Sequence, residues 1–147
     1  MTVAYKPAGY HTITPTIIVN GATRLTEFLK NAFDAKLLVS IPGPNNTVVH
    51  SEVQIGDSRL MIADASPMFS AQSSSFYLYV PDCDELYKRA LAAGAKSERA
   101  PTDQFYGDRN ASVIDEFGNR WSVGTHVEDV SDEELGRRMK AMAGKKG

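Results

Sequence analysis

Three polar side chains share one face of a predicted strand in the stretch VVHSEVQIGDSRLMIAD, residues 48–64. His50, Glu52 and Gln54 alternate with small and apolar residues, and alternate residues of a strand point to the same side of its sheet. The row could hold a metal ion or contact a ligand, but a solvated or dimer-facing surface is its simplest explanation. Because same-face neighbours lie about 6.6 Å apart, the trio could chelate a metal only if its long side chains converged.

His50 and Glu52 therefore stand as candidate ligand contacts and as weak candidates for catalysis. A histidine gains or loses a proton near physiological pH, so His50 could transfer protons.

A second strand, SSFYLYV at 74–80, places Tyr77 and Tyr79 on one face. Aromatic rings with hydroxyl tips suit planar organic ligands, because stacking and a hydrogen bond act together. A role in covering a sheet edge or a dimer interface fits these tyrosines equally well.

The loop DQFYGDR at 103–109 adds two further candidates. Tyr106 is the better candidate for contact with a ligand. Arg109 could bind a carboxylate or phosphonate in bidentate fashion. Asp108 or another nearby acid could instead satisfy Arg109. We favour this structural clamp, while keeping Arg109 among the candidate ligand-binding residues.

The elements that must position these residues follow one order twice. In the first half, TPTIIVN predicts a strand, ATRLTEFLKNAF a helix with apolar residues at helical spacing, and AKLLVSI, TVVHSEVQI and RLMIAD three more strands. In the second half, SSFYLYV is followed by a helix in PDCDELYKRALAAGA and by the strand candidates KSERA, RNASVID and RWSVGTH. The matching order indicates a duplicated unit. Ser131 and Glu134 form a capping-box pattern that predicts a further helix at about 131–143.

The bulk properties favour a soluble single domain. A chain of 147 residues suffices for one compact domain. Sixteen basic and eighteen acidic residues give a net charge of -2, and no basic tract favours nucleic acid or an anionic membrane. The single Cys83 excludes an intrachain disulfide and suits a reducing cytoplasm. We expect a cytoplasmic protein, since neither a signal peptide nor an apolar run of about 20 residues is present.

The chain resembles the vicinal oxygen chelate superfamily, also called the glyoxalase/bleomycin-resistance/dioxygenase fold, and within it the PhnB-like branch. The stretches that carry the resemblance lie at 13–38, 48–64 and 103–131. The resemblance implies an α+β fold of two tandem βαβββ modules, at about 12–66 and 73–127, that form a curved sheet around a cleft, with a C-terminal helix. It also implies a homodimer. It does not fix a reaction, because the superfamily includes both enzymes and drug-binding proteins.

Metal-dependent members of that superfamily usually offer His, Glu or Gln ligands from the first and last strands of each module. By register, these positions fall near Thr14 and Ile62 in the first module and near Ser75 and Ser122 in the second. Their same-face neighbours are Thr16, Asp64, Tyr77 and Gly124, of which only Asp64 could serve as a ligand. A divalent metal usually needs three or four convergent donors. We therefore expect the usual metal site to be absent, with His50 and Asp64 as weak metal candidates.

The sequence thus predicts a single domain, residues 1–147, that binds a small organic molecule as a homodimer, without a cofactor, nucleic acid or membrane. The predicted ligand contacts are Thr16, His50, Glu52, Tyr77, Tyr79, Tyr106 and Arg109. The alternative is a divergent lyase or isomerase of the glyoxalase type. It would use His50, Glu52 or Asp64 for acid–base chemistry or for an off-pattern divalent metal.

Overall fold

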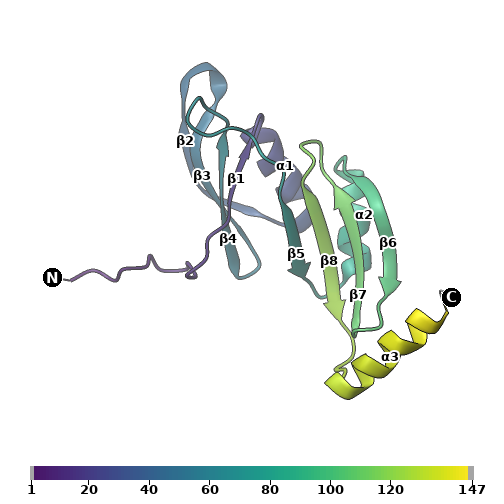
Figure 1. The fold of residues 1–147 in the computed structure, drawn as a ribbon. Coiled ribbons are helices and arrows are strands. Elements are labelled where there is room, and N and C mark those ends of the chain that lie inside the picture. The colour runs from purple at the N-terminus through teal and green to yellow at the C-terminus, as the bar shows by residue number, and fades with distance from the viewer. Residues whose placement is uncertain (1, 146–147) are drawn as a thin grey trace.

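The computed structural model describes residues 2–145, which form two successive strand–helix–three-strand modules followed by a helix (Figure 1). The first module contains β1 (Thr16–Val19), α1 (Ala22–Phe33), β2 (Lys36–Pro42), the short 3-10 helix η1 (Pro44–Asn46), β3 (Val48–Ile55) and β4 (Ser58–Asp64). The second contains β5 (Ser75–Tyr79), α2 (Cys83–Ala92), β6 (Lys96–Asp103), β7 (Asp108–Ile114) and β8 (Arg120–His126). Helix α3 (Asp132–Gly144) comes last. This order confirms the predicted pair of modules and the C-terminal helix.

Each module forms a four-stranded sheet, and the two sheets have the same topology. The strand orders are β1-β4-β3-β2 in the first sheet and β5-β8-β7-β6 in the second. In each sheet the first strand pairs in parallel with the last, while the other pairs are antiparallel. Both β1 and β5 therefore lie at a sheet edge. The shared connectivity is what a duplicated unit predicts.

The helices form where apolar spacing and capping residues favour them. Leu25 and Leu29 of α1, one helical turn apart, are fully buried against the first sheet. Helix α2 begins after Asp82, whose carboxylate accepts a hydrogen bond from the backbone N–H of Glu85 at 3.2 Å. Helix α3 begins after Ser131, whose hydroxyl accepts one from the N–H of Glu134, also at 3.2 Å. The contact at Ser131 confirms the helix start predicted there from the sequence.

The apolar core continues from one module into the other. Trp121 of β8 is fully buried, on the opposite face of the strand from Ser122. Its ring stacks on Phe76 of β5 with centroids 4.6 Å apart, and it meets Phe33 of α1 at 5.7 Å. The indole N–H donates to the carboxylate of Asp115 at 2.8 Å, so its polar atom is satisfied within the core.

Helices α1 and α2 make the most extensive contact between the modules. Arg89 of α2 strengthens this junction by donating to the carbonyl of Asn31 and pairing with Asp34 at 2.7 Å.

Each sheet has one face against its own helix and one open face turned away from the junction (Figure 1). Within residues 2–145, the two open faces belong to two separate four-stranded sheets.

Helix α3 lies across one end of the second sheet (Figure 1). Arg138 holds it there by donating to the carbonyl of Phe105 and pairing with Glu128, both at 2.9 Å. Within residues 2–145, no helix is long and apolar enough to cross a membrane.

Candidate functional site

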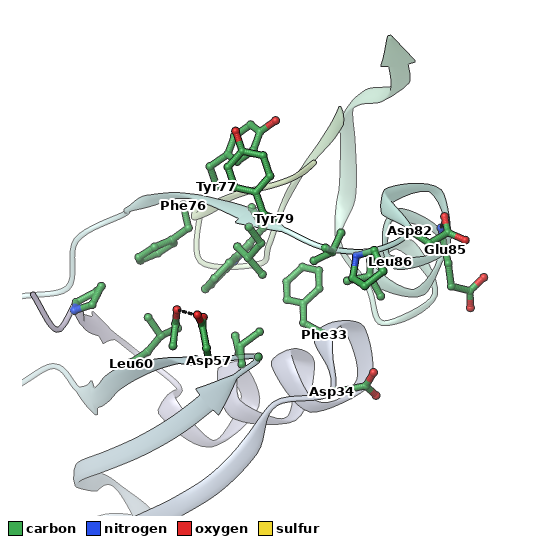
Figure 2. Close-up of a pocket in the computed structure, with 18 residues that line it drawn as sticks. Phe33, Asp34, Asp57, Leu60, Phe76, Tyr77, Tyr79, Asp82, Glu85 and Leu86 are labelled. Carbon is green, nitrogen blue, oxygen red and sulfur yellow. Dashed lines mark hydrogen bonds between the residues drawn. The ribbon is translucent and has the colours of Figure 1, made fainter. Parts of the chain in front are cut away.

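The open face of the second sheet carries the largest set of polar and aromatic side chains from the predicted site. Phe76 and Leu78 of β5 point toward the core, so Tyr77 and Tyr79 project from the other side of the strand (Figure 2). Their ring centroids lie 5.1 Å apart. Gly124 of β8 lies beneath Tyr77, and a methyl group at this glycine would collide with the tyrosine hydroxyl. The missing side chain at Gly124 therefore makes room for the ring.

Asp108, the first residue of β7, connects these tyrosines. It is only 3% exposed, and its Oδ2 accepts hydrogen bonds from the hydroxyls of Tyr77 at 2.8 Å and Tyr79 at 2.9 Å. Its Oδ1 lies 2.9 Å from Nδ1 of His126, the last residue of β8. Burial alone would raise the pKa of Asp108, but the hydrogen bonds from His126, Tyr77 and Tyr79 outweigh it and hold the pKa below its ordinary value. Asp108 is therefore a buried anion.

The same network raises the proton affinity of its other members. Burial is the largest cause of the raised pKa of Tyr77, and the hydrogen bond to Asp108 adds to it. For the more exposed Tyr79, the hydrogen bond to Asp108 is the largest cause of a raised pKa. His126 lies between two carboxylates, with Nε2 2.7 Å from Asp129, and the bonds to Asp108 and Asp129 raise its pKa. Both tyrosines thus stay protonated, and His126 gains its charge more readily than a free histidine.

Asn110 of β7 forms a second polar centre on this face. It is fully buried, and its amide nitrogen donates to the hydroxyls of Tyr106 at 2.7 Å and Tyr77 at 3.1 Å. Its amide oxygen accepts from Arg99 at 2.8 Å and Gln104 at 3.1 Å. The structure therefore brings together the three predicted tyrosines, although Tyr106 comes from the loop between β6 and β7.

The open face of the first sheet carries the predicted histidine and glutamate. Ser51 and Val53 of β3 are buried on the helix side, so His50, Glu52 and Gln54 lie on the open face, as the alternation predicts. Nε2 of His50 lies 3.1 Å from Glu52. Gln54 instead bonds to Arg59 of β4 and to the carbonyl of Gly56. The trio therefore divides into a His50–Glu52 pair and a separate glutamine.

The sequence places Ile62 of β4 at a ligand position facing the cleft, and this assignment is wrong by one residue. Ile62 is fully buried against α1, and its neighbour Asp64 also lies on that side of the strand. Asp64 accepts hydrogen bonds from the N–H groups of Gly21, Ala22 and Val48 at 2.7–2.9 Å, which caps the start of α1. A shift of one position moves every side chain to the other face, so Met61 occupies the open face, beside its register partner Thr16.

The residues at the family's usual ligand positions do not fit a divalent metal. Ile62 has no donor atom, and Met61, which takes its place on the open face, offers only a thioether. Asp64 is engaged by three backbone N–H groups, and Thr14, Ser75 and Ser122 offer only hydroxyls. Among residues 2–145, no three His, Cys, Asp or Glu side chains are grouped so that they could hold an ion. His50 and Glu52 form a pair without a third such donor.

Arg109 lies on the helix side of β7, opposite Asp108 and Asn110. Its guanidinium pairs with Asp84 of α2 at 2.8 Å and with Asp103 of β6 at 3.2 Å. These bonds raise its pKa still further. Arg109 has the geometry of the predicted clamp, and the structure does not bring it together with the tyrosines.

A cavity of about 830 Å³ lies between the modules, and Tyr77 and Tyr79 of β5 are among the residues that line it (Figure 2). Its wall is mainly apolar and includes Phe33, Leu60 and Phe76. Its rim carries carboxylates, including Asp57, Asp82 and Glu85. Strand β5 therefore borders both the cavity and the polar network on the open face.

Three central members of the network were not predicted from the sequence. The sequence indicates Asp108 only as a possible partner of Arg109, and it assigns no site role to His126 or Asn110. The available signal was the alternation of Asp108, Asn110 and Ser112 along β7, which places three polar residues on one face of a strand. Such polar spacing alone indicates a solvent-exposed face of a strand. In the structure all three side chains are at most 3% exposed, so they form a buried network instead.

Comparisons with known proteins agree with this architecture. A model of the Glyoxalase/Bleomycin resistance protein/Dioxygenase superfamily matches residues 10–123. An uncharacterized protein of Mycobacterium bovis is 32% identical over 146 residues, which cover 92% of this chain and 93% of the relative.

Two solved structures share the fold at low sequence identity. TioX from Micromonospora sp. ML1 aligns with a TM-score of 0.63 and 22% identity, covering 78% of this chain and 99% of TioX. A PhnB protein from Bacillus cereus aligns with a TM-score of 0.61 and 17% identity, covering 78% and 99% of the two chains. With two modules of matching topology and a family model that spans most of both, this chain belongs to the Glyoxalase/Bleomycin resistance protein/Dioxygenase superfamily.

Proposed function

We propose that this protein binds a small planar organic molecule on the open face of its second sheet. The observation that carries the proposal is the pair of tyrosines anchored on Asp108. Both hydroxyls donate to one buried carboxylate, which fixes the rings. Tyr77 is 42% exposed and Tyr79 68% exposed, so part of each ring remains available to a ligand. A fixed aromatic surface loses little conformational entropy when a flat molecule stacks on it.

We propose further that a homodimer completes this site. Strand β2 lies at a sheet edge and exposes Leu37, Leu38, Val39 and Ile41 by 39–49% each. Apolar side chains on an uncovered edge strand favour association with a second chain. In such a dimer, the open face of one protomer's first sheet, with Thr16 and the His50–Glu52 pair, would cover the open face of its partner's second sheet. This arrangement would supply the second wall that the tyrosines lack in a single chain.

Calorimetric titration with planar aromatic compounds, such as naphthalene and quinoline derivatives, tests the binding proposal. Tyr79→Ala should weaken binding about three- to tenfold, since an aromatic pair contributes about 0.5–1.5 kcal/mol beyond the area it buries. Tyr5→Ala is the matched control, because Tyr5 is 93% exposed and far from the second sheet in sequence. No binding by any compound of the panel, or equal losses in both variants, would refute the proposal.

Light scattering combined with size-exclusion chromatography tests the homodimer. Ile41→Lys places a charge on the exposed edge strand and should shift the protein toward monomer. Glu27→Lys is the control, because it introduces the same side chain at an exposed position of α1. A wild-type protein that is monomeric at all accessible concentrations would contradict the homodimer.

An enzyme of the lyase or isomerase type is the second candidate. The observation that favours it is the 3.1 Å contact between His50 and Glu52, because a carboxylate orients a histidine for acid–base chemistry. Elemental analysis of the purified protein tests its metal-dependent form. Stoichiometric zinc, nickel, manganese or iron that is lost in His50→Ala would favour the enzyme over simple binding.

The proposal includes a cytoplasmic location. Its support is Cys83, which is buried as a free thiol, as suits a reducing compartment. Fluorescence microscopy of a tagged protein, with fractionation as a second measurement, tests this location. Recovery in an extracellular or membrane fraction would contradict it.

A further inference from the structure

The orientation of the Asn110 amide is fixed by its neighbours. Its Oδ1 receives hydrogen bonds from Arg99 and Gln104, and a guanidinium can only donate. The amide nitrogen must therefore face Tyr77 and Tyr106, which both accept its hydrogens. Because Asn110 is fully buried, it has no space to turn without losing these four bonds.

This orientation leaves the hydrogen of the Tyr106 hydroxyl without an acceptor. A phenol carries one hydrogen, and Tyr77 already gives its own to Asp108 at 2.8 Å. Tyr106 accepts from Asn110 at 2.7 Å and makes no other side-chain hydrogen bond to residues 2–145. The ring is 38% exposed. Its O–H is therefore a donor that can turn toward a bound molecule.

Arg99 provides further donors beside the same amide. Its guanidinium makes one hydrogen bond, to Asn110, and no ion pair with residues 2–145, although a guanidinium has five N–H groups. By contrast, the neighbouring Arg120 on β8 pairs with Glu98 at 2.8 Å. Glu98 lies close enough to interact with the charge of Arg99, but within residues 2–145 no carboxylate forms a direct ion pair with its guanidinium.

We infer that Arg99 and Tyr106, held by Asn110, bind a carboxylate group of the ligand. This inference rests on the proposed binding of a planar molecule to the same face. A carboxylate matches the planar fork of a guanidinium and accepts further hydrogen bonds, here from the hydroxyl of Tyr106. The charge of Asp108 is engaged by Tyr77, Tyr79 and His126, so it does not need a cation from the ligand. The ligand class is therefore an aromatic carboxylic acid, with its ring against Tyr79 and its carboxylate at Arg99.

Paired titrations of 2-naphthoate and 2-naphthamide test this inference. The two probes share the ring and differ in the charge of one group. The wild-type protein should bind the acid about tenfold or more tightly, since hydrogen bonds to charged groups are worth about twice neutral ones. Arg99→Gln and Tyr106→Phe should each reduce this preference while binding of the amide changes little. Lys88→Gln is the matched control, because it removes the same charge from an exposed position of α2, on the other side of the sheet.

The outcomes separate this inference from the proposed function. Equal binding of acid and amide, or a preference that survives in Arg99→Gln, overturns the carboxylate site but leaves binding of planar molecules in place. Absence of binding for both probes and for the wider aromatic panel overturns both proposals. An equal loss of preference in Lys88→Gln would show a general charge effect, which also overturns the site.

Discussion

Substitution of Asp108 tests whether the buried carboxylate organises the open face. Asp108→Ala removes the acceptor of three hydrogen bonds and leaves the hydroxyls of Tyr77 and Tyr79 without an acceptor for their hydrogens. Hydrogen bonds to a charged group contribute about 1.5–3 kcal/mol each, and the donors are partly exposed, so we expect a loss of about 2–4 kcal/mol in the free energy of unfolding. Asp108→Asn keeps one carbonyl oxygen for both tyrosines and should cost less, about 1–2 kcal/mol.

Urea denaturation followed by circular dichroism measures these losses. The pKa of Asp108 is lowered in the folded protein, so its carboxylate stabilises the fold above the unfolded pKa of about 3.9. This contribution is lost as the pH falls through the folded pKa, and the difference between wild type and Asp108→Ala should shrink there. A loss below about 0.5 kcal/mol for Asp108→Ala, within the range of ordinary surface changes, would refute the reasoning. So would a larger loss for Asp108→Asn than for Asp108→Ala.

Three further changes test other parts of the structure. Asp64→Ala should lower the free energy of unfolding by about 1–3 kcal/mol, measured by urea denaturation, because it removes the acceptor for two N–H groups at the start of α1 and for the N–H of Val48 at the start of β3; an unchanged midpoint would contradict the capping role. The pKa of His126 is raised in the folded protein, so its charged ring stabilises the fold fully below its unfolded pKa of about 6.5. This stabilisation is lost as the pH rises through the folded pKa. In His126→Gln the free energy of unfolding should therefore change less with pH above pH 6.5 than it does in the wild type. An unchanged pH dependence would count against the contact with Asp108. Gly107→Ala should destabilise the connection to α3, because Gly107 has φ of +99° and a methyl group there would collide with the carbonyl of Glu128; hydrogen exchange in α3 as slow as in the wild type would contradict this expectation.

The fold was predictable because its signals are local and repeated. Each module carries its own strand alternation and helical spacing, and the same order occurs twice. The helix start at Ser131 followed from its capping pattern with Glu134. Each of these features depends on residues within a few positions of one another.

The network on the open face was not predictable in the same way. Tyr77 and Asp108 are 31 positions apart, and their contact depends on β5 and β7 lying on either side of β8. Alternation then decides which neighbours join the network, since Arg109 projects from the opposite face to Asp108 and Asn110. The same sensitivity explains the error at Ile62, where one position decides between the core and the open face.

The contact of Phe33 with Trp121 has a consequence for how the chain unfolds. The two rings come from different modules and lie 5.7 Å apart within one buried cluster. Unfolding of either module would expose buried apolar side chains of the other to water. The two modules should therefore unfold in a single cooperative transition. A molecule that contacts only the second half would then raise the melting temperature of the entire chain.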